Sequence, residues 1–121
     1  MPSDGAARIR PPAKRAGLAS GQRKTLGAAG IYYGLAEVTI QNKRGLHARA
    51  AAAFVRTAEK FDAEISVTKD GQTVGGGSIM GLLMLGASQG STILIETEGP
   101  EAEEALEALI VLVEAGFNES E

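Results

Sequence analysis

The sequence contains no cysteine and no tryptophan, and it has a single histidine among its 121 residues. The absence of cysteine excludes a disulfide framework and thiolate metal sites. A metal site needs several ligands, and no second histidine or cysteine can join His47, so we expect neither a metal nor another cofactor. No apolar stretch approaches the length of a bilayer span, and the N-terminus lacks the continuous apolar segment of a secretory signal. We therefore expect a cytoplasmic protein with no membrane partner.

Charge and large apolar side chains are distributed unevenly along the chain. Residues 1–35 carry six basic side chains and one acidic one, whereas residues 36–121 carry six basic and fourteen acidic ones. The first segment is rich in proline and small residues and has few large apolar residues to bury. Burial must offset the entropy of ordering a chain. We therefore predict a disordered basic extension at residues 1–35 and one folded domain at residues 36–121.

The extension has several interpretations. It is either dispensable or the result of a misplaced start codon, although a later start would need a non-ATG codon because no methionine lies between Met1 and Met80. Its positive charge would permit contact with nucleic acid, but the basic residues are scattered and only Tyr32 and Tyr33 could stack on bases. We therefore expect no nucleic-acid partner. An arginine-rich, acid-poor transit peptide is the remaining interpretation.

Hydrophobic periodicity predicts the element order β-α-β-β-α-β-α after residue 35. Asp70-Gly71 fits a two-residue hairpin turn, and Ser78 fits the N-cap of a short helix that Gly86 ends. Strands separated by helices, with one tight hairpin, predict an α+β open-faced β-sandwich in which helices cover one face of the sheet. The predicted elements are a strand at 36–41, a helix from about 48 to 61, strands at 64–69 and 72–74, a short helix at 78–85, a strand at 92–97 and a helix at 100–116.

His47 lies in the run Gly45-Leu46-His47-Ala48-Arg49, after a glycine turn and just before a helix. Helix N-termini present free backbone N–H groups and a partial positive charge, which bind phosphate well. The Arg49 guanidinium can add charge-assisted hydrogen bonds to a phosphoryl group. The pattern predicts that His47 accepts a phosphoryl group and that Arg49 stabilises it. The alternative is that His47 is an ordinary capping or surface residue.

The short helix predicts a docking surface as well as core contacts. Leu82 and Leu85 fall on one face and should enter the core. The other side is rich in methionine, whose flexible side chain suits several partners. Alternatively, these residues complete the core, an interpretation that fits Leu83 better than Met80. With Ala48 beside His47, the predicted partner surface comprises Ala48, Ile79, Met80, Leu83 and Met84.

From about Glu37 to Glu121, the sequence resembles HPr, the histidine phosphocarrier of the bacterial phosphotransferase system. The run at residues 45–49, the run Ser78-Ile79-Met80-Gly81-Leu82-Leu83-Met84-Leu85-Gly86 and the position of the last helix carry the resemblance. Shorter pieces, including the ending Gly116-Phe117-Asn118-Glu119, are similar to the nitrogen-related branch, NPr. The resemblance implies a four-stranded antiparallel sheet backed by three helices. Residues 1–35 have no counterpart in the core of that family.

The resemblance also implies a function and partners. His47 would take a phosphoryl group at Nδ1 from an Enzyme I-type phosphodonor and pass it to a histidine on an EIIA-type acceptor. It would form a covalent intermediate without turning over a small molecule by itself, and the carrier would be a monomer. Ser78 would be a regulatory site for an HPr kinase/phosphorylase, although a helix cap alone also explains this serine.

One residue departs from the family pattern, and one hypothesis of another class remains. Ala50 occupies the place where the family usually has proline directly after the active-site arginine. Proline in the first helical turn fixes φ and removes an unpaired N–H, so alanine leaves one more donor there. The competing hypothesis is a non-catalytic regulatory module that binds a protein or ligand without carrying phosphate; such a module would not need His47 and Arg49.

Overall fold

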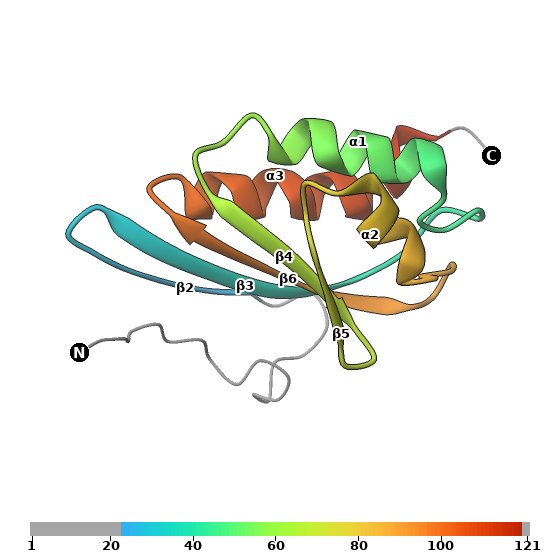
Figure 1. Ribbon diagram of the computed structural model, residues 1–121, viewed down its shortest axis with the longest axis horizontal. Helices are drawn as coiled ribbons and strands as arrows, with labels where there is room; N and C mark the ends of the chain where they lie inside the picture. Colours follow the sequence, from blue (N-terminus) through green and yellow to red (C-terminus); the bar gives the residue numbers. More distant parts are fainter. Residues whose placement is uncertain (1–22, 120–121) are drawn as a thin grey trace.

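The computed structural model describes residues 23–119 and contains one antiparallel sheet with helices on one of its faces (Figure 1). The strands follow the order β2-β3-β6-β4-β5 across the sheet. Each pair of neighbouring strands is antiparallel. The elements in chain order are β2 (Arg23–Ala28), β3 (Ile31–Thr39), α1 (Ala48–Ala58), β4 (Glu64–Lys69), β5 (Gln72–Gly75), α2 (Ile79–Met84), β6 (Thr92–Gly99), α3 (Ala102–Glu114) and a 3-10 turn (Gly116–Asn118).

The core lies between the helices and the three inner strands of the sheet, β3, β6 and β4. Successive side chains of a strand point to opposite faces, so one alternating set from each strand meets the helices. This set includes Val38, Ile93 and Ile95, each at most 1% exposed. Phe54 of α1 and Leu106 of α3 pack into the same cluster and are fully buried. Burial of these apolar surfaces fixes α1, and with it the residues at its N-terminus, against the sheet.

The open-faced sandwich is confirmed, and from β3 onward the helices and strands follow the predicted order. The strand predicted at residues 64–69 is β4 without change. Asp70 and Gly71 have φ angles of 51° and 82°, the left-handed conformation that a tight hairpin turn requires. The short helix and the last strand and helix also lie where the sequence predicts them.

The predicted strand count is wrong, and so is the predicted disorder of residues 23–35. The sheet has five strands rather than four, because β2 and β3 form a hairpin that begins at Arg23. Residues 23–35 are therefore part of the sheet and not a disordered extension. Residues 1–22 lie outside the described residues, so the predicted disorder there stays a prediction.

The hairpin escaped prediction because it buries little apolar surface. Leu26 and Ile31 are 66% and 54% exposed, so these two large apolar side chains contribute little to the core. Residues 23–35 are ordered instead by strand pairing with the rest of the sheet. Leu35 is only 2% exposed, and the Tyr33 hydroxyl donates a hydrogen bond to the Glu96 carboxylate on β6. The turn between the strands uses Ala29, at φ 56°, before Gly30. Alanine is an uncommon residue for that conformation, so the sequence carries no turn signal there.

The helices of the described part are all short. Within residues 23–119, no helix combines the length and the apolar character that crossing a bilayer demands.

Candidate functional site

His47 is the N-cap of α1, and a tight backbone contact sets its position. Gly45 has a φ of 68°, and a Cβ atom there would lie 2.5 Å from the carbonyl oxygen of Ala87. The next amide, that of Leu46, donates to the same carbonyl at 2.8 Å. Only glycine allows both the left-handed backbone and the close approach. The loop before α1 is thereby fixed against the loop that precedes β6.

The backbone N–H groups at the start of α1 lie around the His47 ring. The first intrahelical bond is donated by Ala51 to the His47 carbonyl at 2.8 Å, so the N–H groups before Ala51 have no acceptor one turn earlier. The Arg49 N–H points at the His47 Nδ1 atom, at 3.3 Å. Ala48 and Arg49 are exposed. The predicted phosphoryl site is therefore an accessible helix N-terminus with a histidine nitrogen on it.

The second nitrogen of His47 contacts a carboxylate from the other end of the chain. The His47 Nε2 atom lies 2.6 Å from Oε2 of Glu119. Because Nδ1 accepts the Arg49 N–H, a neutral His47 ring carries its proton on Nε2 and donates it to Glu119. The nitrogen that faces the helix N-terminus then holds a lone pair. This is the atom to which the resemblance to HPr assigns the phosphoryl group.

Asn42 holds Glu119 in place. Its Nδ2 atom donates to Oε1 of Glu119 at 3.0 Å and to the carbonyl of Gly45 at 2.8 Å. Asn42 is only 2% exposed. Both amide N–H groups have acceptors, which sets the orientation of the amide, while Oδ1 has no partner among the described residues. One buried side chain thus joins the glycine turn before His47 to the carboxylate behind it.

The sequence reasoning missed Glu119 and Asn42. Glu119 is 72 positions from His47, and no local pattern joins residues so far apart. The structure brings them together because Phe117 and Asn118 adopt left-handed φ angles of 58° and 59°, and Phe117 is buried. The one local signal was Asn42, an asparagine in the turn before His47. From the sequence alone, this turn is predicted only as a polar loop.

The other predicted site residues lie on α1 and α2, which pack against each other (Figure 1). Ser78 is the N-cap of α2, and its hydroxyl accepts the Gly81 N–H at 3.0 Å. Met80 and Met84 are 68% and 67% exposed, and Ile79 is 39% exposed. Leu83 is half-buried and packs against the core, as the alternative interpretation of that residue expects.

Ala50, which replaces the family proline, is completely buried in the first turn of α1. Its N–H precedes the first intrahelical bond, so the helix does not need that donor and tolerates either residue.

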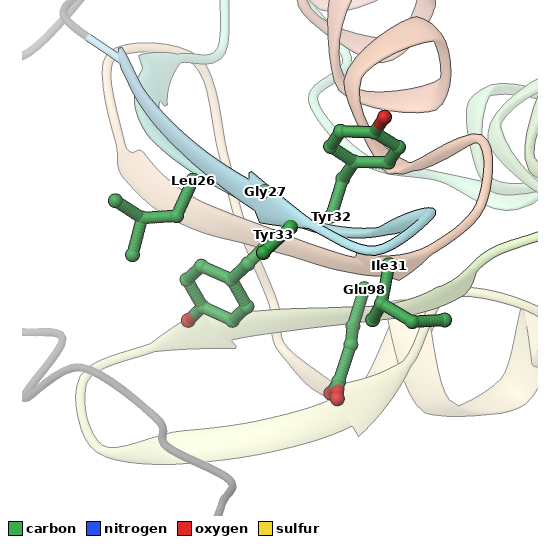
Figure 2. A pocket seen from close by; sticks show the side chains of 7 residues that line it. Leu26, Gly27, Ile31, Tyr32, Tyr33 and Glu98 are labelled. Carbon is green, nitrogen blue, oxygen red and sulfur yellow. The ribbon is translucent and has the colours of Figure 1, made fainter.

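One hollow of the described surface is remote from His47. It lies over the β2–β3 hairpin, has a volume of about 380 Å³, and is lined mainly by apolar atoms of the hairpin together with Glu98. In Figure 2, Tyr32 points to one face of the hairpin, while Leu26, Tyr33 and Glu98 lie on the other. Nothing places a reacting group there. Within residues 23–119, no three histidine or carboxylate side chains gather closely enough to hold a metal ion.

These observations define a small α+β protein whose single histidine caps a helix and offers one nitrogen to a partner. Comparison with known proteins agrees. Residues 36–115 match the family described as "PTS HPr component phosphorylation site". The phosphocarrier protein HPr of Cupriavidus necator is 44% identical over 85 residues, which are 70% of this chain and 96% of that protein. The phosphocarrier protein NPr of Shewanella violacea is 44% identical over 84 residues, 69% of this chain and 92% of that protein.

Solved structures give the same result. An HPr structure from Thermoanaerobacter tengcongensis is 47% identical and superposes with a TM-score of 0.69 over 72% of this chain and 98% of that one. An HPr from Bacillus anthracis is 49% identical, with a TM-score of 0.65 over 67% of this chain and 96% of that one. The chain belongs to the HPr family of phosphocarriers of the phosphotransferase system.

The close approach at Gly45 leads to a testable expectation. Gly45→Ala should lower the free energy of unfolding by roughly 2–5 kcal/mol, because left-handed strain of about 1–2 kcal/mol adds to overpacking of about 1–3 kcal/mol. Gly86→Ala is the matched control, since Gly86 has a φ of 61° but nothing within 4 Å of its Cβ position. It should lose only about 1–2 kcal/mol. Urea unfolding measures both; equal losses would contradict the contact with Ala87.

The Glu119 carboxyl leads to an expectation about pH. Burial acts to raise its pKa, but hydrogen bonds from Asn42 and His47 and the charges of His47 and Arg44 outweigh burial and lower the pKa below the ordinary 4.5. A lowered pKa in the folded state means that the ionised carboxylate stabilises the fold above about pH 4.5, and that this contribution is lost as the pH falls through the folded pKa. Carbon-13 NMR of the Glu119 carboxyl should give a midpoint below 4.5.

Asn42→Ala should raise that midpoint, because it removes one of the donors that lower the pKa. Gln41→Ala removes the neighbouring exposed amide and should leave the midpoint unchanged. A wild-type midpoint at or above 4.5, or the same shift in both variants, would refute this account of Glu119.

Proposed function

We propose that His47 accepts a phosphoryl group at Nδ1 from an Enzyme I-type phosphodonor and passes it to a histidine on an EIIA-type acceptor. The observation that carries this proposal is the placement of Nδ1 on the N-terminus of α1 while Glu119 accepts a hydrogen bond from the Nε2–H. Among the described residues His47 is also the only imidazole. As the first steps of such a system are protein-to-protein transfers, we propose that the carrier works in the cytoplasm and as a monomer.

The chemistry follows from the ring and the helix. The Nδ1 lone pair attacks phosphorus, the bond between phosphorus and the donor breaks, and its electron pair leaves with the donor. The proton on Nε2 stays where it is. The Arg49 N–H bond to Nδ1 is long, at 3.3 Å, so a small movement frees the lone pair and turns that N–H toward a phosphoryl oxygen. Transfer to the acceptor reverses these steps.

The charge on the phosphoryl group is met by groups that are already in position. Free N–H groups at the start of α1 and the dipole of the helix face it without reorganisation. The exposed Arg49 guanidinium adds charge-assisted bonds once the phosphoryl group is present. Phosphoryl transfer needs mainly positioning and charge stabilisation, which a small accessible site supplies jointly with its partner.

The docking surface for donor and acceptor is the exposed side of α2 together with the start of α1. Met80 and Met84 carry most of its exposed apolar area, with Ile79 and Ala48 beside them. Half-buried Leu83 supports this surface more than it contributes contact area. Exposed methionines adapt to differently shaped partners, as a carrier with at least two partners requires.

Ser78 is the proposed site of regulation by an HPr kinase/phosphorylase. Its hydroxyl is exposed and caps α2, whose next residues form the docking surface. A phosphate on it would be stabilised by the helix N-terminus and would place negative charge beside the exposed methionines. Modification there would therefore change partner binding without unfolding the helix.

Phosphorylation of His47 can be tested directly. Incubated with an active Enzyme I-type donor and phosphoenolpyruvate, the wild-type protein should gain one phosphate that is labile in acid and stable in alkali, as expected for phosphohistidine. His47→Ala should gain none, because it has no nucleophile; mass spectrometry after each treatment is the measurement. Equal labelling of both proteins would contradict the proposal. So would no labelling with a donor proven active, the result expected of a purely regulatory module.

A second test addresses Ser78. With ATP and an HPr kinase/phosphorylase, the wild-type protein should gain one phosphate and Ser78→Ala should gain none. Ser88→Ala, which removes another exposed serine, is the control and should behave like wild type. The cap has a separate readout: Ser78→Ala should lower the free energy of unfolding by about 1 kcal/mol, whereas Ser78→Asp retains a capping oxygen. Phosphate at another residue would contradict the regulatory role.

A further inference from the structure

Glu119 is a carboxylate outside the family-matched segment that contacts the histidine of the site. We propose that Glu119 is a positioning residue for phosphoryl transfer, which keeps the proton of His47 on Nε2 and so keeps the lone pair on Nδ1. The inference rests on the proposed function, because it gives Glu119 a part in the transfer by His47. The helix N-terminus acts only on the Nδ1 side of the ring, through the Arg49 N–H, and that contact is long, at 3.3 Å.

The first step concerns the tautomer. A neutral imidazole in water exchanges its proton between the two nitrogens, and only the form with the proton on Nε2 can attack through Nδ1. The Glu119 carboxylate is an acceptor with no proton to give, and it lies 2.6 Å from Nε2. It therefore favours the form that attacks. The Arg49 N–H makes the same selection from the other side, since it can bond only to an unprotonated Nδ1.

The second step concerns charge. As Nδ1 forms its bond to phosphorus, the ring gains positive charge, because the Nε2 proton stays on it. A carboxylate on that proton stabilises the developing charge, as the buried aspartate does for the histidine of serine proteases. When the acceptor takes the phosphoryl group, the electron pair of the N–P bond returns to Nδ1 and the ring becomes neutral again. The same contact therefore acts in both transfers, and no proton has to enter or leave.

The third step concerns rigidity, which separates a positioning residue from a surface ion pair. Exposed ion pairs contribute little because both side chains move freely in water. The Glu119 side chain is only 9% exposed and the His47 side chain 18%. The second oxygen of Glu119 accepts from buried Asn42, and the backbone N–H of Glu119 donates to the Gly116 carbonyl at 3.1 Å. Buried Phe117 ties this turn to the core. The carboxylate is therefore held at the ring by three separate anchors.

The test uses Glu119→Gln, which keeps the size of the side chain but replaces one carboxylate oxygen by an NH₂ group. Glu114→Gln is the matched control: Glu114 is exposed, lies in the same C-terminal region and loses the same charge. Nitrogen-15 NMR of the His47 ring, at a pH where the ring is neutral, reports which nitrogen carries the proton. We expect a protonated Nε2 and a bare Nδ1 in wild type and in Glu114→Gln, and a mixture of tautomers in Glu119→Gln.

The rate of phosphoryl transfer to the carrier is the second measurement. Mutation of the carboxylate behind a metal-ligating histidine costs about tenfold to hundredfold in metal affinity or activity, and we expect a fall of about that order in transfer rate for Glu119→Gln. Glu114→Gln should transfer at the wild-type rate. An unchanged tautomer in Glu119→Gln, or a rate equal to that of Glu114→Gln, would overturn the inference.

The two proposals fail in different ways. If wild type were not phosphorylated on His47, the proposed function would fall even though the NMR result stood. If wild type were phosphorylated normally while Glu119→Gln matched it in rate, only the role of Glu119 would fall. The amide dispersion of the folded protein shows whether each variant keeps its structure, so a loss of rate through unfolding is recognised.

Discussion

The candidate site depends on one backbone contact, the approach of Gly45 and Leu46 to the carbonyl of Ala87. That contact joins two loops that are far apart in the sequence, one before α1 and one before β6. Leu46 and Ala87 are both buried, so the apolar core holds the two loops together while the hydrogen bond sets their register. His47 comes immediately after this contact. The backbone on both sides of His47 is fixed by hydrogen bonds, so the ring is held at the start of the helix. The packing of the sandwich therefore determines where the His47 side chain lies.

Because the backbone fixes His47 at the start of α1, the site needs few charged side chains. The structure buries no charged group on the phosphoryl side of His47; it presents backbone N–H groups of α1, which cost no desolvation of a charge when they are left in water. Only on the opposite side of the ring does it use a carboxylate, and there a buried amide supports it. The face toward the partner can stay open, because charge stabilisation comes from groups that the helix already orders. Two proteins can then approach the same nitrogen in turn.

Sequence reasoning succeeds where local chemistry decides the structure. The β4–β5 hairpin was predictable because Asp70-Gly71 supplies the positive φ angles that a tight turn needs. Ser78 was predictable as a cap because a hydroxyl directly before a helix can accept the N–H three residues later, here that of Gly81. His47 and Arg49 were predictable as a pair because both lie on one helix N-terminus.

The two features that were not predictable depend on distant partners. The Ala29-Gly30 turn of the β2–β3 hairpin has no clear signal of its own, and β2 exists because β3 offers it an edge to pair with. Leu26 and Ile31 stay largely exposed in the folded state, so burial of these side chains does not explain why the hairpin forms. Glu119 reaches His47 only through the left-handed turn at Phe117 and Asn118, and the pattern of the last helix does not reveal that the chain turns back.

Both of these features lie outside residues 36–115, the segment that matches the HPr family. The matched segment contains the sandwich, the glycine turn, the helix N-terminus and the serine cap, which are enough to place a phosphoryl acceptor. It does not contain the group that chooses between the two nitrogens of that acceptor. In this chain the choice is made by Glu119 through Asn42, which lies inside the matched segment and is buried to receive it. The site is therefore completed by a residue beyond residues 36–115, Glu119, which is held by a residue within them, Asn42.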